Sequence, residues 1–258
     1  MKIMFIGAGN LATHLAQALK KAGHEITQVY SRTMTSAAAL AEKVGASPVT
    51  NTDELNGNAD ACIMAVKDSV LEELIGKICT GRGNLVFVHT AGSMPMSMFE
   101  GHAPSYGVLY PMQSFSKERA ADFSKIPCFL EWNGDRARIV ITRLAESVSR
   151  VHYEMDSDAR KHLHLAAVFA SNFVNHCYEL SSEILEKYNL PFDVMLPLTD
   201  EIAAKVHEMK PRDAQTGPAV RYDENVMDKH KRMLEDKPLM KKIYETMSES
   251  IHKTAAEK

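Results

Sequence analysis

The sequence predicts an α/β fold, in which an N-terminal doubly wound parallel sheet is followed by an all-helical C-terminal domain. Two observations support the sheet: short apolar segments alternate with helical segments up to about residue 155, and the first apolar segment runs directly into a glycine-containing turn and a helix. A third supports the helical domain, because the pattern from Asp156 onward is almost wholly helical. We therefore expect two domains, residues 1–155 and 156–258.

The first strand and helix are the most informative segment of the chain. Residues 2–6 form an apolar run that predicts a buried strand, and the helix after it repeats apolar residues on one face until Gly23 ends it. Between them, Gly7, Gly9 and Ala12 spell G-x-G-x-x-A. Gly7 suits a tight turn, Gly9 lets the backbone approach a pyrophosphate, and Ala12 lets helix and strand pack closely.

This strand–turn–helix unit is typical of a Rossmann-type dinucleotide-binding domain. The free N–H groups and the positive dipole end of the new helix would face the phosphates. The structural alternative is a tight turn that binds nothing, but only a close backbone approach requires a residue without a side chain at Gly9. We expect the cofactor to contact Gly7, Ala8, Gly9, Asn10 and Leu11.

The end of the second predicted strand, residues 24–30, indicates which dinucleotide binds. Ser31, Arg32 and Thr33 follow this strand. An NAD-binding domain places an acidic residue here, about 20 residues past the glycines, to bind the ribose 2′-hydroxyl. No acidic residue stands there, and an arginine beside two hydroxyls suits a 2′-phosphate. The alternative is a solvated surface arginine; we expect NADP rather than NAD, bound in part by these three residues.

Strands and helices keep alternating through the first domain. Strands are predicted at residues 46–50, 59–66, 84–89, 107–111, 127–132 and 151–155, and helices at 37–44, 68–78 and 134–149. In a doubly wound sheet, ligands bind at the carboxyl ends of the strands. Those ends supply the remaining predicted cofactor contacts, which are Val66, Lys67, His89, Thr90 and Ala91. His89 is equally well explained as a strand-end histidine that bonds to the backbone.

Helices are predicted in the second domain at residues 158–188, 191–208 and 223–253. The first is too apolar between residues 163 and 173 for a surface helix, yet His164, Ser171 and Asn172 lie there on one face. Buried polar groups need partners, which internal hydrogen bonds, a dimer contact or a substrate would supply. On the substrate hypothesis His164 is the general acid, because imidazole exchanges protons near neutral pH. Ser171 and Asn172 would orient the substrate.

Two polar residues outside these elements complete the candidate site. Gln113 lies on the turn that connects the predicted strands at 107–111 and 127–132. Arg221 follows a Gly217–Pro218 turn, which is plainly explained as a structural break between helices. Its guanidinium is equally suited to fork onto an anionic group. We include both residues as candidate substrate contacts and leave the two interpretations of Arg221 open.

Composition excludes several classes of protein. A net charge of −3 over 258 residues gives no bias toward polyanions, so we expect no nucleic-acid partner. The scattered cysteines are typical of a reduced cytoplasmic protein without a cysteine metal site; they are Cys62, Cys79, Cys128 and Cys177. The first strand leaves no room for a signal peptide, and no apolar run is long enough to span a bilayer. We therefore expect a soluble, cytoplasmic protein.

The chain resembles Rossmann-like proteins described as deazaflavin-dependent NADP oxidoreductase-like, whose C-terminal half is a helical domain of unknown function. The matching residues are Gly7-Ala8-Gly9-Asn10 with Ala12, Ser31-Arg32, His89-Thr90-Ala91-Gly92, Tyr110-Pro111-Met112-Gln113, His164 with Ser171-Asn172, and Thr216-Gly217-Pro218 with Arg221. More distantly, the chain is similar to pyrroline-5-carboxylate reductase and the 6-phosphogluconate dehydrogenase-like superfamily. The resemblance implies the same N-terminal fold and a helical second domain that often forms dimers, so we expect a homodimer.

The sequence departs from these relatives in two places. In the hydroxyacid members of the superfamily, a Lys and an Asn one turn apart on the first long helix carry out the proton transfer. Lys161 and Asn172 do not have that spacing, and His164 shares a face with Asn172 instead. Tyr222 stands where a glycine is expected after the arginine. Because the likeness to deazaflavin-dependent proteins lies in the cofactor-binding half, we leave the use of a deazaflavin open.

Together these patterns predict an NADP-dependent oxidoreductase that moves a hydride between nicotinamide and a small carbonyl or imine substrate. One alternative is a non-catalytic protein that binds NADP(H), as a sensor or an assembly subunit. Another is a structural dimer with a vestigial fingerprint.

Overall fold

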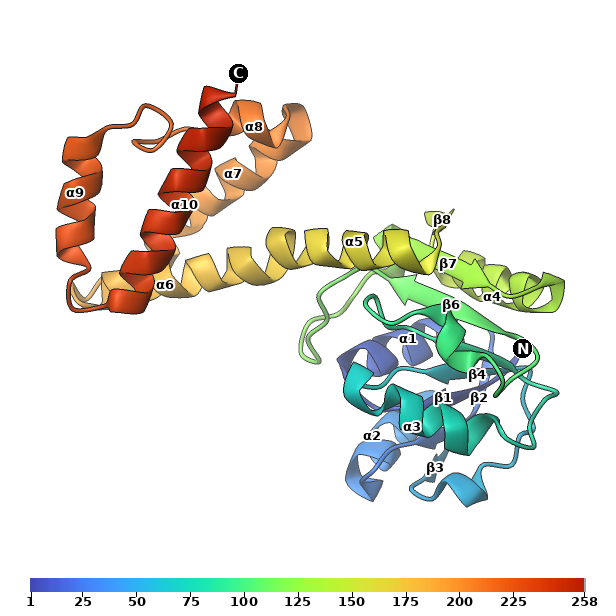
Figure 1. The fold of residues 1–258 in the computed structure, drawn as a ribbon. Helices are drawn as coiled ribbons and strands as arrows, with labels where there is room; N and C mark the ends of the chain where they lie inside the picture. Colours follow the sequence, from blue (N-terminus) through green and yellow to red (C-terminus); the bar gives the residue numbers. More distant parts are fainter. Residues whose placement is uncertain (258) are drawn as a thin grey trace. The chain divides into compact units, whose positions relative to one another are not determined.

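The protein is described by a computed structural model over residues 1–257, which form an eight-stranded sheet and a series of helices (Figure 1). The strands are β1 (Lys2–Ile6), β2 (Glu25–Tyr30), β3 (Ser47–Val49), β4 (Ala61–Met64), β5 (Val86–His89), β6 (Tyr106–Pro111), β7 (Cys128–Trp132) and β8 (His152–Glu154). Their order in the sheet is β3-β2-β1-β4-β5-β6-β7-β8. The predicted doubly wound α/β fold is confirmed.

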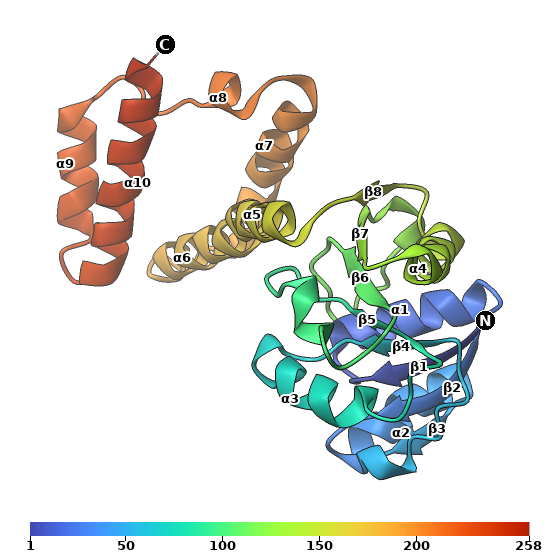
Figure 2. The same cartoon turned by 45° about the vertical axis from the view of Figure 1, so that its right-hand side comes forward.

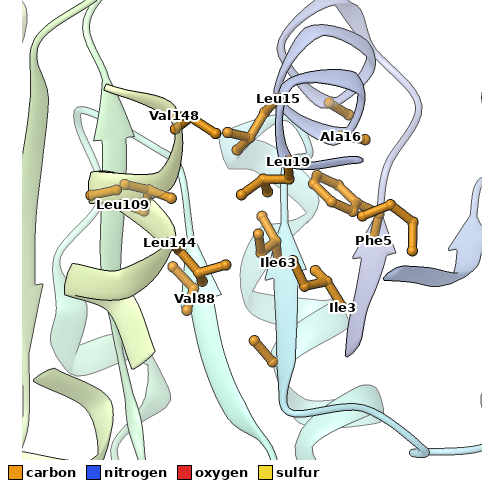
Figure 3. Close-up of a cluster of buried hydrophobic side chains, with 14 of the residues drawn as sticks. Ile3, Phe5, Leu15, Ala16, Leu19, Ile63, Val88, Leu109, Leu144 and Val148 are labelled. Carbon is orange, nitrogen blue, oxygen red and sulfur yellow. The ribbon is translucent and has the colours of Figure 1, made fainter. Parts of the chain in front are cut away.

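Helices cover both faces of this sheet. They are α1 (Asn10–Lys21), α2 (Met34–Val44), α3 (Asp68–Cys79) and α4 (Asp135–Val148), with the 3-10 turns η1 (Thr52–Glu54), η2 (Met96–Phe99) and η3 (Phe123–Lys125). Ile3 and Phe5 of β1 pack in one apolar cluster with α1, α2 and α4, part of which Figure 3 shows. Met4 and Ile6 pack in a second cluster with α3 and η2. Because alternate side chains of a strand point to opposite faces, the central strand must be apolar throughout.

The strand register aligns the carboxyl ends of the central strands. Ile6 pairs in parallel with Tyr30 of β2 and with Met64 of β4. Met64 pairs in turn with His89 of β5. The loops that follow β1, β2, β4 and β5 therefore leave the same edge of the sheet, where ligands bind in doubly wound folds.

The sequence predicted a parallel sheet, but one pair of strands in the structure is antiparallel. β6 and β7 pair antiparallel, with Leu109 opposite Leu130, whereas β7 and β8 pair in parallel across α4. Residues 112–127 between β6 and β7 contain only the short turn η3 and otherwise form a loop. A parallel pair normally needs a helix as its crossover, so without one the chain returns antiparallel.

The helix predicted at 158–188 consists of three consecutive segments. They are α5 (Ser157–Ala167), a π-helix η4 (Val168–Phe173) and α6 (Val174–Glu186). Asp156 caps α5, because its carboxylate accepts a hydrogen bond of 2.8 Å from the Ala159 N–H. The π segment contains Ser171 and Asn172, and π-helical turns inside α-helices occur frequently at functional sites.

By compactness, the chain divides into a first unit, Met1–Asn172, and a second unit that begins at Phe173. The sequence-based boundary at 155/156 marks the end of the sheet instead. The first unit also includes α5, because Arg160 of this helix is bound to Glu131 of β7. As a division between functional domains, the boundary at 155/156 stays a prediction.

The second unit is helical. After α6 it contains η5 (Phe192–Met195), α7 (Leu196–Glu208), α8 (Pro211–Ala214), α9 (Glu224–Met233) and α10 (Pro238–Ala256). The prediction of one helix at 223–253 is wrong, because Pro238 has no N–H to continue the preceding helix and instead begins a new one. α9 and α10 lie side by side (Figure 2), and the Tyr244 hydroxyl is hydrogen-bonded to His230 Nδ1 at 3.0 Å.

Few side chains of the second unit are buried. The buried apolar ones within its described residues are Leu185, Ala219, Met227, Leu234 and Met240. Leu198, Ile202 and Val206 of α7 are 58%, 49% and 48% exposed, and their spacing aligns them in one apolar stripe. No helix within residues 1–257 has the length and apolar character to cross a bilayer.

Two isoleucines of α4 test the packing of the first unit. Ile141 is fully buried against the sheet, whereas Ile139 is 63% exposed on the same helix. We expect Ile141→Ala to lower the free energy of unfolding by about 2–5 kcal/mol, because it leaves a cavity. Ile139→Ala should change it by less than about 0.5 kcal/mol. Urea unfolding of both variants measures the difference, and equal effects would contradict this packing.

Candidate active site

A cleft of about 800 Å³ opens at the carboxyl ends of β1, β2 and β4. It is lined by the turns after these strands and by part of α3. The predicted cofactor contacts in its lining are Gly7, Ala8, Gly9, Ser31, Arg32, Val66 and Lys67. The structure therefore brings the glycine-rich turn and the arginine after the second strand into one cleft.

The two glycines of the turn have different physical roles. Gly7 has a φ of +111°, and a Cβ atom there would lie 2.2 Å from the Ala65 carbonyl oxygen. Only glycine fits that position, which holds the end of β1 against the end of β4. Gly9 has an ordinary φ of −75°, and no protein atom lies within 4 Å of the place of its Cβ. The protein backbone thus does not require glycine at position 9, and a side chain there would project into the cleft.

The start of α1 is suited to bind an anion. Gly9 is the N-cap and supplies no side-chain cap, and the first turn contains no acidic residue. The N–H groups of that turn are therefore not satisfied by a capping side chain, and the helix dipole adds partial positive charge there. Together with the glycines, this end of the helix fits the pyrophosphate of a dinucleotide.

Arg32 supplies positive charge at the end of β2. Its side chain is exposed, and it makes no ion pair with any described residue. The neighbouring Thr33 caps α2, since its hydroxyl accepts a hydrogen bond from the Ser36 N–H. Glu73, the acidic residue among the described residues of the lining, is paired with Lys77 at 2.6 Å. The guanidinium of Arg32 is therefore available to an anionic ligand.

The other predicted cofactor contacts lie outside the cleft lining; they are Asn10, Leu11, Thr33, His89, Thr90 and Ala91. The Asn10 amide donates a hydrogen bond of 2.8 Å to the Phe115 carbonyl, and Thr33 is used as a cap. Thr90 is 5% exposed, and its N–H bonds to the Met64 carbonyl at 3.3 Å. Contact of these residues with a cofactor stays a prediction.

His89 is buried and is hydrogen-bonded to the backbone of the loop that follows it. Its side chain is fully buried and stacks on Phe99 with ring centroids 5.8 Å apart. The Ala91 N–H donates to its Nδ1 at 3.2 Å. Burial, reinforced by the charge of Arg160, lowers the pKa of His89 to about 3, so the ring is neutral at physiological pH. Of the two interpretations left open, the structure shows the histidine bonded to the backbone.

A second cavity, of about 450 Å³, lies between the end of β6 and the helix of residues 163–172. Four predicted site residues line it: Gln113, His164, Ser171 and Asn172. The shared helix face was predicted for the last three, and the fold adds Gln113 from the loop after β6. The cavity lining within the described residues is otherwise apolar except for Tyr110 and Ser114.

His164 is held by a tyrosine that sequence analysis did not select. The Tyr110 hydroxyl and His164 Nδ1 are hydrogen-bonded at 3.1 Å, and the two rings meet edge to face. A Cβ atom on Gly92 would lie 2.7 Å from His164 Nδ1 and 2.9 Å from the Tyr110 ring. Gly92 is therefore required for space, because the two rings occupy the place of its side chain. Burial raises the pKa of Tyr110, which keeps the hydroxyl protonated.

A buried ion pair fixes α5 on the sheet one turn before His164. Arg160 is fully buried, and its guanidinium bonds to the Glu131 carboxylate and, at 2.6 Å, to the Met94 carbonyl. The Ser157 hydroxyl donates to Glu131 at 2.7 Å and accepts from Arg160 at 3.1 Å. A charged pair is stable in such a place only when further hydrogen bonds satisfy it. Here they join the loop after β5, strand β7 and helix α5.

Sequence analysis gave no site role to Tyr110, Arg160 or Glu131. Tyr110 entered it only as part of a matching motif, because it lies in an apolar strand and looks like part of the core. Arginine is almost never fully buried, so the burial of Arg160 was not expected. The one signal in the sequence was its position four residues before His164, which places both residues on the same helix face.

Arg221 belongs to the second unit, so it is described there by itself. Its side chain is exposed, at the end of the turn that Gly217 makes with a φ of +110°. Tyr222 has a φ of +53°, a left-handed conformation that explains why glycine was expected at this position. The Tyr222 ring packs on His252, with centroids 4.3 Å apart. The predicted role of Arg221 as an anion clamp stays a prediction.

Comparison with protein families identifies both halves of the chain. The family described as NADP oxidoreductase coenzyme F420-dependent matches residues 2–91, and a domain of unknown function, DUF2520, matches residues 126–251. A crystal structure of a "putative NADP oxidoreductase" from Bacteroides fragilis is 54% identical, with 98% of each chain covered and a TM-score of 0.94. The chain belongs to the family that joins these two domains, which confirms the resemblance named from its motifs.

More distant structures share the fold. An imine reductase from Myxococcus stipitatus in complex with NADP+ is 14% identical, with a TM-score of 0.68 over 99% of this chain and 94% of its own. A 1-pyrroline-5-carboxylate reductase from Streptococcus pyogenes is 14% identical, with a TM-score of 0.67 over 98% of each chain. No curated protein matches the sequence.

The two glycines of the first turn make a testable pair. Gly7→Ala should lower the free energy of unfolding by about 2 kcal/mol or more, because it forces a positive φ and a backbone clash. Gly9→Ala should cost about 1 kcal/mol or less, since its methyl group meets no protein atom. Chemical unfolding of the ligand-free variants measures both. A Gly9→Ala variant as unstable as Gly7→Ala would show that the protein fold itself requires both glycines.

Proposed function

We propose that this protein is an NADP(H)-dependent oxidoreductase that moves a hydride between nicotinamide and a small carbonyl or imine substrate. The observation that carries the proposal is the cleft at the ends of β1, β2 and β4. In it, a glycine that the fold does not require faces the open start of α1, and an unpaired Arg32 follows β2. The family membership and the names of its relatives agree with this chemistry.

In this proposal the turn of residues 7–9 and the first turn of α1 hold the pyrophosphate. Arg32 binds the 2′-phosphate, with Ser31 and the start of α2 beside it. Val66 and Lys67, from the turn after β4, complete the contacts along the cleft. When bound, the nicotinamide supplies or accepts the hydride.

Arg32 gives the first functional test. A charge-assisted hydrogen bond to phosphate contributes about 1.5–3 kcal/mol, so Arg32→Ala should weaken NADPH binding about ten- to a hundredfold and leave NADH nearly unchanged. Fluorescence titration of both nucleotides measures this. Arg150→Ala, an exposed arginine outside the cleft lining, is the matched control. Equal losses for NADPH and NADH would contradict the assignment of the 2′-phosphate.

We assign the proton transfer to His164. It lines the cavity of about 450 Å³, and its Nδ1 is bonded to Tyr110. This bond leaves Nε2 to exchange a proton with the substrate oxygen or nitrogen. Tyr110 keeps the ring oriented while the proton leaves, because its hydroxyl can either donate to Nδ1 or accept from it.

The remaining residues of the cavity orient the substrate. Ser171, Asn172 and Gln113 place a hydroxyl and two amides around it, and none of them carries a charge. We propose that they hydrogen-bond to the carbonyl or imine group and to its polar neighbours. Arg221 would bind an anionic group of the substrate, a role that rests on the sequence alone.

The second functional test separates catalysis from structure. His164→Ala should keep its melting temperature and NADPH affinity but lose about 10²–10⁴-fold in turnover, the usual contribution of a general acid. His162→Ala, an exposed histidine outside the cavity lining, should keep its activity. The assay follows NADPH oxidation with a panel of carbonyls and imines, and with a deazaflavin as a further acceptor.

Two outcomes of this test would contradict the proposal. A large fall in melting temperature of His164→Ala, with a matching loss of NADPH binding, would make the polar face structural. Tight NADPH binding by the wild-type protein without turnover of any acceptor would favour the alternative of a non-catalytic NADP(H) sensor.

We further propose that the helical unit joins two copies of the chain. Its exposed apolar residues include the stripe of α7, whereas few of its apolar side chains are buried. Large exposed apolar patches usually mark interfaces, and homodimers are the commonest assembly.

Light scattering at micromolar concentration tests the dimer. The wild-type protein should show about twice the chain mass of 28.7 kDa. Ile202→Glu places a charge in the middle of the α7 stripe and should give monomers, because an unpaired charge is costly to bury in an interface. Ile139→Glu, on the exposed side of α4, should remain dimeric. A monomeric wild-type protein would overturn the proposal.

A further inference from the structure

The loop after β6 crosses from the sheet to the first helix and is fixed there by two hydrogen bonds. We call residues 112–119 the strap. The Asn10 amide donates to the Phe115 carbonyl at 2.8 Å, and His14 Nε2 donates to the Ser116 carbonyl at 2.8 Å. The Phe115 ring stacks on His14, with ring centroids 5.6 Å apart. Two polar side chains of the first turns of α1 are thus used to hold this loop.

These bonds determine where the next residue lies. Lys117 directly follows Ser116 and lines the dinucleotide cleft together with Gly9. Its side chain is exposed and forms no ion pair with any described residue. The two residues before Lys117 are hydrogen-bonded to Asn10 and His14 of α1, the helix whose start faces the pyrophosphate in the proposed function.

The charges around the cleft show what Lys117 would bind. The cations in its lining are Arg32, Lys67, Lys77 and Lys117. Lys77 is paired with Glu73, and Arg32 is assigned to the 2′-phosphate. The pyrophosphate at the start of α1 is a second centre of negative charge, for which helix N–H groups alone provide only partial positive charge.

We propose that Lys117 is a pyrophosphate-binding residue, which the strap positions over the start of α1. This inference rests on the proposed binding of NADP(H) in the cleft. It also gives Asn10 a different role from the one predicted from sequence, because its side chain positions the strap rather than contacting the cofactor. His14 has the same positioning role.

Binding of NADPH and NADH to Lys117→Met tests the proposal. Methionine keeps the length of the apolar side chain and removes the charge, so the strap should fold unchanged. Because both nucleotides contain the pyrophosphate, both should bind about tenfold more weakly, by the same factor. Lys117→Arg should restore most of the affinity. Lys125→Met, an exposed lysine between the same two strands but outside the cleft lining, should bind both nucleotides like the wild-type protein.

The strap itself is tested by His14→Ala, which removes both the hydrogen bond and the ring contact. It should weaken NADPH and NADH equally, by less than Lys117→Met does, and should add little when combined with Lys117→Met. Unchanged binding of both nucleotides by Lys117→Met would overturn the inference, and so would a loss confined to NADPH, which would place Lys117 at the 2′-phosphate. If the wild-type protein binds neither nucleotide, the proposed function fails first, and the inference fails with it.

Discussion

The candidate active site depends on one buried ion pair. Arg160 is fully buried, and its guanidinium joins Glu131 of β7, the Met94 carbonyl and the Ser157 hydroxyl. Three segments far apart in the sequence therefore meet at one side chain: the loop after β5, strand β7 and the start of α5. Removing one partner of such a pair leaves an uncompensated charge and typically costs about 3–5 kcal/mol. Because α5 is fixed there, His164 one turn further on meets Tyr110 at the end of β6.

A second constraint operates at the other end of the site, where backbone geometry rather than charge decides the sequence. Gly7 lets the end of β1 approach Ala65 closely, after the end of β4. The register of β1, β2, β4 and β5 aligns the carboxyl ends of all four strands. The loops that follow these strands must then surround one cleft. Gly92 is also required for space, at the second cavity, because a side chain there would overlap the rings of His164 and Tyr110. At both positions, glycine is required because its backbone lies too close to other protein atoms to leave room for a side chain.

The sequence predicted local features well, and it predicted poorly what depends on distant contacts. The G-x-G-x-x-A turn and the helix face of His164, Ser171 and Asn172 follow from residues near one another in the chain, as does the start of the helical pattern after Asp156. The burial of Arg160 could not be predicted in this way, because its partners come from distant segments, the loop after β5 and strand β7. The antiparallel β7 could have been expected from the lack of a crossover helix after β6, and the break before α10 from Pro238. Both signals were in the sequence, but the alternation of strands and helices outweighed the first, and the helical pattern over residues 223–253 outweighed the second.

The central claim is that the cleft and the cavity serve one reaction, with a dinucleotide along the ends of the strands and His164 beside its reactive ring. The most direct measurement is a crystal structure of the protein with NADPH bound. The account predicts the 2′-phosphate on Arg32, the pyrophosphate at the start of α1, and nicotinamide C4 facing the cavity that His164, Gln113 and Asn172 line. A nicotinamide ring directed away from this cavity, or a 2′-phosphate without contact to Arg32, would contradict it.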